Sequence, residues 1–197
     1  MTKSKAIKSV CVYCGASNAA DPDFIKAAAE FGKALAGADV RMVYGGGGVG
    51  LMGACARAAH QAGGKVLGVM PEFLRTREVL FDDVETIVVK SMHERKKRMY
   101  DEADAFAVLP GGIGTLEEVI ELMSWRRLSL HTKPIVFLTM KNYWDILFEL
   151  FVHTVDNKMT PVAFMDAWRS VEHVDDLLPR ILQMASGEEA PNMPLVT

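Results

Sequence analysis

Leu109-Pro110-Gly111-Gly112-Ile113-Gly114-Thr115-Leu116-Glu117-Glu118 joins an apolar run to an amphipathic stretch. The apolar run 105–109 stops at a proline, after which come glycines, a threonine and two carboxylates. This order predicts a buried strand, a glycine turn and the start of a helix. Glycine lets the backbone approach an anion closely, and the first N–H groups of a helix point at it. The stretch therefore predicts a phosphate cradle with carboxylates beside it, which indicates chemistry on a nucleotide or sugar phosphate.

The same alternation of apolar strand and amphipathic helix continues in both directions. We expect strands at 10–14, 40–44, 66–70, 86–90, 105–109, 134–139 and near 168–171, and helices at 22–36, 50–62, 91–104, 115–128, 143–154 and 174–185. Continuous apolar strands joined by helices indicate a parallel sheet covered on both faces. We therefore predict a Rossmann-like α/β fold with a doubly wound parallel sheet. It forms a single domain over 1–185, followed by a flexible tail over 186–197.

Composition excludes several classes of protein. The chain has 197 residues, half of them hydrophobic, which argues against disorder. Its formal net charge of −3 favours neither nucleic acid nor an anionic membrane, and no apolar run is long enough to span a bilayer. Three cysteines fit a reducing compartment, so we expect a cytoplasmic protein. Cys11 and Cys14 have the spacing of a redox pair, but in a strand they point to opposite faces, which favours burial in the core.

Turns of glycine or small residues follow three of the predicted strands, at 15–17, 45–48 and 111–115. In open parallel sheets, ligands bind at the carboxyl ends of strands, where the strand order reverses. Ser17 in the first turn is a candidate phosphate ligand, although an ordinary turn serine is an equal alternative. No Walker lysine follows these turns, and 45–50 matches a dinucleotide fingerprint only weakly.

Glu118 admits two interpretations. Thr115 followed three residues later by glutamate is typical of a capping box with Thr115 as the N-cap. On a helical wheel the apolar stripe comprises Leu116, Val119, Ile120 and Met123. Glu118 falls outside this stripe, near Leu122 and Trp125, and such a leucine–tryptophan patch indicates a partner surface. We therefore predict a homodimer formed through this helix, with Glu118 beside the interface.

The run Met92-His93-Glu94-Arg95-Lys96-Lys97-Arg98-Met99 supplies a second set of charges. On a helix, Arg95 and Lys96 share a stripe with the two methionines. The two cations either snorkel to solvent or bind an anion, such as a phosphate or a carboxylate. This helix and the glycine turn follow consecutive strands, so we expect both to reach the same edge of the sheet.

Other polar residues give weaker signals. Glu78 lies in the irregular segment 72–83 beside Arg75 and Arg77, and composition alone makes it a surface loop residue. The five histidines show no metal-ligand spacing, and no Gly-x-Ser-x-Gly elbow is present. We therefore expect neither a metal site nor a serine hydrolase.

Three segments together resemble one family. Residues 110–118 fit the pattern P-G-G-x-G-T-x-x-E, residues 92–96 fit M-H-x-R-K, and 45–53 contains a third glycine segment. From about residue 10 to 171, the chain closely resembles the LOG ("Lonely guy") family of cytokinin riboside 5′-monophosphate phosphoribohydrolases. Many members carry an older lysine decarboxylase label. The resemblance implies that no cofactor is needed, and that the protein is a dimer or an assembly of dimers with the site beside the interface.

The resemblance also implies an activity and the residues that carry it. The reaction is hydrolysis of the N-glycosidic bond of an adenine-type nucleoside 5′-monophosphate, N6-modified or plain AMP, to free base and ribose 5-phosphate. Arg95 and Glu118 correspond to the catalytic pair. The residues expected to bind substrate are Ser17, Gly46, Glu78, Met92, Lys96, Gly111, Gly112, Ile113, Gly114, Thr115 and Glu117. Ile113 stands where plant members usually have tyrosine, which bears on the preferred base.

Hydrolysis of a ribosyl–base bond passes through an oxocarbenium-like transition state. We expect Glu118 to bind the ribose hydroxyls and stabilise this cation, or to orient water, and Arg95 to hold Glu118 ionised or support the departing base. Three alternatives stay open. One is a hydrolase of AMP or of purine nucleotides in general, and another is a nucleotide sensor or carrier without catalysis. The third is a pyridoxal phosphate-dependent decarboxylase, for which Lys96 is the lysine near the predicted site.

Overall fold

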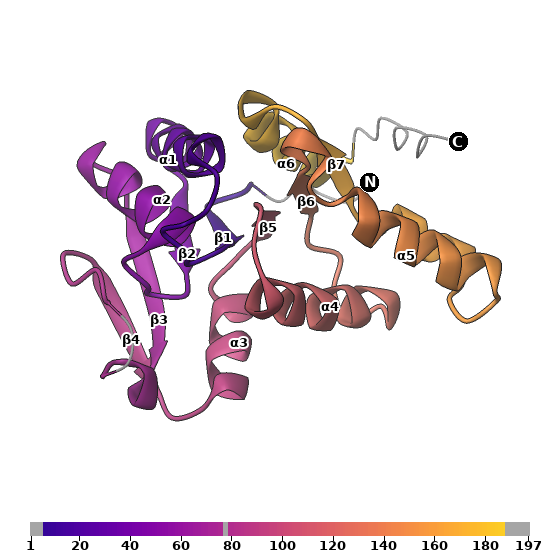
Figure 1. Ribbon diagram of the computed structural model, residues 1–197, viewed down its shortest axis with the longest axis horizontal. Coiled ribbons are helices and arrows are strands. Elements are labelled where there is room, and N and C mark those ends of the chain that lie inside the picture. The colour runs from indigo at the N-terminus through magenta and orange to yellow at the C-terminus, as the bar shows by residue number, and fades with distance from the viewer. Residues whose placement is uncertain (1–5, 77–78, 188–197) are drawn as a thin grey trace.

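Residues 6–76 and 79–187 are described by the computed structural model of this chain, and they form one seven-stranded sheet (Figure 1). Its strands are β1 (Ser9–Tyr13), β2 (Arg41–Tyr44), β3 (Val66–Pro71), β4 (Glu85–Val89), β5 (Ala105–Val108), β6 (Ile135–Leu138) and β7 (Arg169–Val171). They lie in the order β4-β3-β2-β1-β5-β6-β7, and every neighbouring pair is parallel. The predicted doubly wound parallel sheet is confirmed, and each strand lies within one residue of its expected bounds.

Helices cover both faces of the sheet. Within the described residues they are α1 (Pro22–Gly37), α2 (Gly50–Gln61), α3 (Met92–Asp101), α4 (Ile113–Arg127), α5 (Asp145–Asp156) and α6 (Leu177–Ser186). Short 3-10 turns lie at η1 (Glu72–Leu74), η2 (Met140–Asn142), η3 (Val162–Asp166) and η4 (Val174–Asp176). Helices α1, α2 and α6 pack on one face of the sheet, and α3, α4 and α5 pack on the other (Figure 1).

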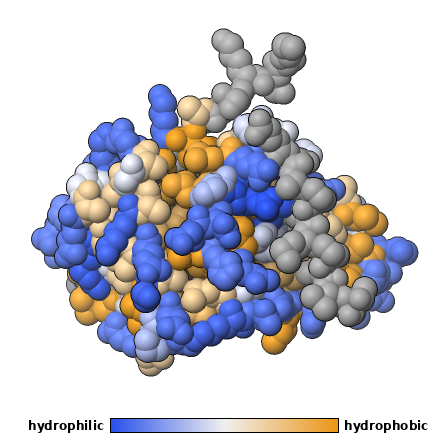
Figure 2. Space-filling model, turned by 90° about the horizontal axis from the view of Figure 1, so that it is seen from above, coloured by the Kyte–Doolittle hydropathy of each residue, from blue (hydrophilic) through white to orange (hydrophobic). Residues whose placement is uncertain are grey.

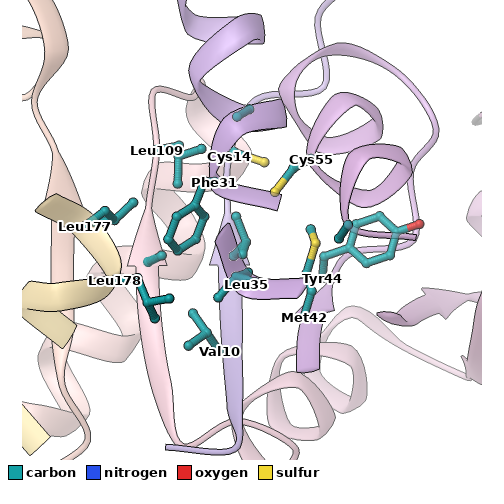
Figure 3. Packing of buried hydrophobic residues seen from close by; sticks show 14 of the residues in the cluster. Val10, Cys14, Phe31, Leu35, Met42, Tyr44, Cys55, Leu109, Leu177 and Leu178 are labelled. Carbon is teal, nitrogen blue, oxygen red and sulfur yellow. The ribbon is translucent and has the colours of Figure 1, made fainter. Parts of the chain in front are cut away.

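Each face of the sheet carries its own hydrophobic cluster, because successive strand residues point to opposite sides. On the first face, Phe31 and Leu35 of α1 pack against strand residues such as Val10 and Met42 (Figure 3). On the second face, aromatic residues dominate, with Phe137 edge-on to Phe148 at 5.2 Å between ring centroids. The central strands are therefore buried from both sides, as a doubly wound sheet requires.

The cysteines belong to these clusters. Cys11 lies in the cluster under α3 to α5 and Cys14 in the cluster under α1 and α2, so the predicted opposite orientation is confirmed. All three cysteines are buried and free. Burial raises the pKa of the Cys11 and Cys14 thiols well above their ordinary value, which keeps both protonated near neutral pH.

The strand order reverses between β1 and β5. The backbone N–H of Gly15, after β1, donates to the Pro110 carbonyl, after β5, at 3.0 Å. Earlier in the same pair of strands, the Leu109 N–H donates to the Tyr13 carbonyl at 2.9 Å. The glycine turns that follow the two strands are therefore side by side, at the place where ligands bind in folds of this class.

Helix boundaries agree with the sequence less closely than strand boundaries do. Asp21 caps α1 by accepting from the Asp23 N–H, with Pro22 in the first turn, as expected. The predicted helix 174–185 is instead η4 followed by α6, and the helix expected from residue 143 begins at Asp145. Helix α6 ends at Ser186, and the rest of the predicted tail from 188 onward lies outside the described residues.

Helix α4 differs from its prediction in two ways. It begins at Ile113 with Gly112 as the N-cap, so Thr115 lies within the first turn and the capping-box interpretation is wrong. Leu122 is 2% exposed and lies in the core, whereas Ile120 is 44% exposed. Trp125 packs edge-on against Tyr100, with ring centroids 5.2 Å apart. The leucine–tryptophan patch inferred from the wheel therefore does not exist as an exposed surface.

Among the described residues, no helix combines the length and apolar character needed to cross a bilayer. Figure 2 views the molecule from the side on which α1 and α6 lie in Figure 1. Hydrophilic residues make up most of the visible rim of this face and surround a smaller hydrophobic area (Figure 2).

Candidate active site

A cleft of about 550 Å³ lies at the carboxyl ends of the central strands. Its wall is built from 14–16 after β1, Met52 of α2, Met92 and Arg95 of α3, and residues 112–115, 117 and 118 of α4. Four separate segments of the chain thus converge at the reversal of strand order. This is the position that the fold predicts for a ligand site.

Arg95 is held from three directions. It is 7% exposed, and its Nε donates to the Val69 carbonyl of β3 at 3.1 Å. Its Nη2 donates to the Gly45 carbonyl, just after β2, also at 3.1 Å. The remaining terminal nitrogen, Nη1, lies 3.5 Å from Oε1 of Glu118. Two backbone acceptors therefore fix the plane of the guanidinium and aim it at the carboxylate.

Glu118 is the second buried charge of the cleft. It lies in the second turn of α4 and is only 8% exposed. A carboxylate removed from water is costly unless it is paired, and the guanidinium of Arg95 supplies an opposite charge. The influence of Glu118 reaches the neighbouring thiols: burial raises the pKa of Cys14, and the nearby Cys55 and the charge of Glu118 add to this shift. Cys14 therefore lines the cleft as a neutral thiol rather than as a nucleophile.

The N-terminus of α4 forms the anion-binding part of the cleft. Gly112 is the N-cap in an extended conformation, and no described side chain caps this helix. Leu116 is the first residue whose N–H bonds back into the turn, to the Gly112 carbonyl at 3.0 Å. The N–H groups of residues 113–115 consequently have no acceptor within the helix and lie at its positive end. This arrangement suits a phosphate.

Tyr143 braces this turn from outside the cleft. Its hydroxyl donates to the Gly111 carbonyl at 2.7 Å. The tyrosine follows Lys141 and Asn142, two non-glycine residues with φ of 54° and 59°. Asparagine tolerates left-handed backbone, but at Lys141 this conformation is strained and persists only where the surrounding structure holds it. Lys141 is held by ion pairs to Asp21 and Asp23, both at 2.7 Å.

Lys96 lies behind the cleft wall rather than in it. Its Nζ forms ion pairs with Glu117 and, at 3.0 Å, with Glu121 of α4. Burial lowers the pKa of Lys96, but the hydrogen bonds to Glu117 and Glu121 outweigh this effect and leave the pKa above its ordinary value. The lysine is therefore a protonated strut between α3 and α4, next to the Arg95–Glu118 pair.

Comparison with known proteins gives a consistent result. A family model described as "Possible lysine decarboxylase" matches residues 52–181. The probable cytokinin riboside 5′-monophosphate phosphoribohydrolase LOG4 of Oryza sativa subsp. japonica is 37% identical over 181 residues, which cover 91% of this chain and 79% of that protein. The cytokinin riboside 5′-monophosphate phosphoribohydrolase LOG7 of Arabidopsis thaliana is 42% identical over 164 residues, which cover 82% of this chain and 75% of that protein.

This chain belongs to the LOG family. The two most specific LOG motifs come together in the structure. M-H-x-R-K contributes Arg95 and P-G-G-x-G-T-x-x-E contributes Glu118, and their charged groups lie 3.5 Å apart. The interpretation that the buried cation binds a carboxylate is thereby confirmed for this pair.

Solved structures share the fold of this LOG-family chain. The molybdenum cofactor carrier protein of Chlamydomonas reinhardtii superposes with a TM-score of 0.70 and 19% identity, over 91% of this chain and 98% of that chain. DNA processing protein A of Streptococcus pneumoniae gives a TM-score of 0.54 and 14% identity, over 87% of this chain and 60% of that chain. At such low identity these likenesses establish the fold alone.

The cleft brings together most of the site residues predicted for a LOG-family protein. Those that line it are Met92, Arg95, Gly112, Ile113, Gly114, Thr115, Glu117 and Glu118. Ser17 is exposed and its hydroxyl accepts from the Ala19 N–H, whereas Gly46 is buried, and a Cβ atom on it would lie 3.1 Å from Cε of Met70. Neither lines the cleft, and Glu78 lies outside the described residues.

Sequence reasoning missed two residues of an apolar wall and a brace. Ala16 and Met52 line the cleft beside the predicted Met92 and Ile113, and the Ile113 side chain is 85% exposed. Met52 could have been predicted, because it lies in the first turn of the helix that follows the second glycine turn. Tyr143 could not have been found in this way, because its contact with Gly111 joins segments 32 residues apart in the chain.

Proposed function

We propose that this protein hydrolyses the N-glycosidic bond of adenine-type nucleoside 5′-monophosphates and releases the free base and ribose 5-phosphate. The observation that carries the proposal is the buried Arg95–Glu118 pair, which opens onto a cleft that ends at the uncapped N-terminus of α4. The phosphate site and the carboxylate of Glu118 lie one to two helical turns apart on α4. This separation matches the distance between the 5′-phosphate and the anomeric carbon of one ribose. Family membership and the names of the relatives point to the same reaction.

Phosphate binding positions the sugar. The N–H groups of residues 113–115 would hold the 5′-phosphate, and this contact lies away from the bond that breaks. Binding energy from such a remote group can be used to place the reacting carbon against the catalytic residues. The ribose then lies beside Glu118, whose position in the second turn of α4 follows directly from the phosphate site.

Glu118 stabilises the transition state. As the bond to the base breaks, positive charge develops on the ribose ring. A fixed carboxylate in a partly dry cleft stabilises that charge and accepts hydrogen bonds from the ribose hydroxyls or from the attacking water. Arg95 has its guanidinium committed to the carbonyls of Val69 and Gly45, so its part is to pair with Glu118 and hold the carboxylate oriented. An arginine is not an efficient proton donor at neutral pH.

The base is expected against the apolar wall of Ala16, Met52, Met92 and Ile113. Methionine and isoleucine side chains pack on a flat ring without requiring particular polar edges. Both N6-modified adenine, as in the cytokinin nucleotides named for the relatives, and the plain adenine of AMP fit this chemistry. A panel of nucleoside 5′-monophosphates, measured by base release, ranks these substrates directly.

We further propose that the protein acts as a homodimer with the active site beside the interface. The apolar surface that supports this lies between α4 and α5 rather than at Trp125. A groove of about 300 Å³ there is lined by residues that include Ile120, Met123, Leu150 and Phe151. Ile120 and Leu150 are exposed. Sedimentation of the intact protein at micromolar concentration tests this assembly, and a monomer would contradict it.

We place the reaction in the cytoplasm. The three cysteines are free thiols, and proteins of oxidising compartments usually pair theirs. Fractionation of the producing cells tests this location.

The decisive variant is Glu118→Gln, which keeps the shape of the side chain and removes its charge. We expect base release from AMP and isopentenyladenosine monophosphate to fall about 10²-fold or more in a protein that still folds. Glu121→Gln is the matched control: Glu121 lies one turn further along α4, pairs with Lys96 and does not line the cleft. Near-normal turnover by Glu118→Gln would show that the carboxylate is not catalytic.

Two other functions are tested by the same material. A nucleotide carrier would bind AMP without releasing adenine. The buried Arg95–Glu118 pair argues against a carrier, because binding a nucleotide does not require a buried carboxylate beside the ribose. A pyridoxal phosphate-dependent decarboxylase needs a lysine that can form a Schiff base. Lys96 is held by Glu117 and Glu121 with a raised pKa, which is opposite to the activation of such a lysine. Release of carbon dioxide from lysine would overturn this assignment.

A further inference from the structure

Gly45 lies against the guanidinium of Arg95. It directly follows β2, and its carbonyl accepts from Arg95 Nη2 at 3.1 Å. A Cβ atom on Gly45 would lie 1.9 Å from the same Nη2 and 3.0 Å from Cζ. The next nearest atom, Cε of Met52, would be in ordinary contact at 3.4 Å. The volume that a side chain at position 45 needs is therefore the volume that the guanidinium occupies.

The backbone at Gly45 does not require glycine. The φ of Gly45 lies outside the left-handed region, whereas the adjacent Gly46 has a φ of 85°. Gly48 and Gly53 are constrained differently, because a Cβ there would lie 2.6 Å from the Leu80 carbonyl oxygen and 2.2 Å from the Gly48 carbonyl oxygen, respectively. Backbone atoms cannot yield, but the end of an arginine side chain can. Gly45 thus differs from these neighbours in what excludes a side chain.

We propose that Gly45 is a positioning residue whose missing side chain creates the seat of the Arg95 guanidinium. A methyl group at this position displaces Nη2 and Cζ, and so breaks the hydrogen bonds to Gly45 and Val69 that aim Nη1 at Glu118. The fold itself has little need of this glycine. The catalytic consequence rests on the hydrolase function proposed above, whereas the geometric claim does not.

The first test compares activity with stability in Gly45→Ala. We expect kcat/KM for AMP to fall about 10- to 100-fold, mainly in kcat, because a misplaced catalytic group loses transition-state contacts. The melting temperature should fall by less than the decrease of about 10 °C expected for Arg95→Met, because the displaced guanidinium keeps its positive charge near Glu118 although its hydrogen bonds are lost. Gly53→Ala should instead lower the melting temperature by clearly more than Gly45→Ala does. Gly37→Ala in α1, where a Cβ meets no atom within 4 Å, should leave kcat/KM unchanged and should not lower the melting temperature.

The second test is a double-mutant cycle with Arg95→Met. Methionine ends near the level of Nε and leaves the space of Nη2 and Cζ empty, so the methyl group that Gly45→Ala introduces has nothing to displace. The double variant should have the kcat/KM of Arg95→Met alone, within about threefold. Losses that multiply instead would show that Gly45 acts independently of Arg95 and would overturn the proposal.

A third measurement separates the seat of Arg95 from the reaction. The Nε–H of Arg95 is buried and donates to Val69, so its nitrogen–proton signal should exchange slowly in the wild-type protein. Gly45→Ala should shift this signal and speed its exchange. An unchanged signal would refute the positioning role even if activity fell. If the wild-type protein released no base from any nucleotide, the proposed function would fail while this spectrum still decided the role of Gly45.

Discussion

Arg95→Met removes the guanidinium that faces Glu118 while keeping an apolar stem of similar length. The side chains of both partners are only 9% exposed, so solvent screens their charges weakly. Removing one partner of a buried ion pair costs about 3–5 kcal/mol, because the remaining charge stays in a low-dielectric site. The carbonyls of Val69 and Gly45 also lose the donor that binds them. For a chain of this size, about 2–4 °C of melting temperature corresponds to each kcal/mol, so we expect a decrease on the order of 10 °C.

Thermal unfolding followed by circular dichroism at pH 7 measures this decrease, and the double variant Arg95→Met/Glu118→Gln tests its cause. Glutamine carries no charge, so the double variant should be more stable than Arg95→Met and regain about half of the loss. The remaining deficit comes from the two carbonyls. A double variant that is less stable than Arg95→Met would refute the reasoning, because it would show that the charge left at Glu118 is not what destabilises the single variant.

Two further predictions concern Tyr143, which contacts the glycine turn before α4, and His131, which follows the C-terminal end of α4. Tyr143→Phe removes the hydroxyl that donates to Gly111, so KM for the nucleotide should rise about fivefold, the value of one hydrogen bond, with kcat nearly unchanged; an unaltered KM would contradict the bracing role. Burial lowers the pKa of His131 below its ordinary 6.5, so the unfolded chain takes up this proton at a higher pH than the folded one. Stability is then fully present above about pH 6.5 and decreases as the pH falls below it, by at most about 1.4 kcal/mol per pH unit. His131→Gln should flatten the dependence of unfolding free energy on pH between about 5 and 6.5, and equal slopes in the two proteins would exclude His131 as its source.

The strands and the position of the site were accessible from sequence because their signals are local. Each strand is a short, continuous apolar run, and both faces of the sheet bury it. Asp21 and Pro22 mark the start of α1 by capping chemistry alone. The glycine turns after β1 and β5 identified the ligand edge, since parallel strands end on the same side. The meeting of Arg95 and Glu118 followed from the same rule.

The face of α4 was misjudged for a physical reason. Its buried residues are Thr115, Glu118, Val119, Leu122 and Met123, which is a regular helical stripe. Two members of this stripe are polar because they belong to the cleft. A wheel that counts only apolar residues omits them, so the inferred stripe turned toward Ile120 and left Leu122 outside. When polar functional residues belong to the buried face of a helix, a wheel of apolar residues therefore assigns the buried face to the wrong side.

Lys96 and Tyr143 depend on contacts between distant segments, which no local pattern records. The resemblance made Lys96 a candidate ligand, whereas the structure pairs it with Glu117 and Glu121. Tyr143, which donates to the Gly111 carbonyl 32 residues earlier in the chain, directly follows the left-handed residues Lys141 and Asn142. Neither residue type favours that conformation strongly enough to be predicted without the surrounding structure.

The central position of β1 has a consequence for how the chain folds. Val10 pairs with Met42 on one side, 32 residues along the chain, and with Ala105 on the other, 95 residues along. Closing the longer loop costs more chain entropy, so we expect the β1–β5 pairing to form after the β1–β2 pairing. The cleft spans this junction. We therefore expect the appearance of activity during refolding to report the β1–β5 pairing.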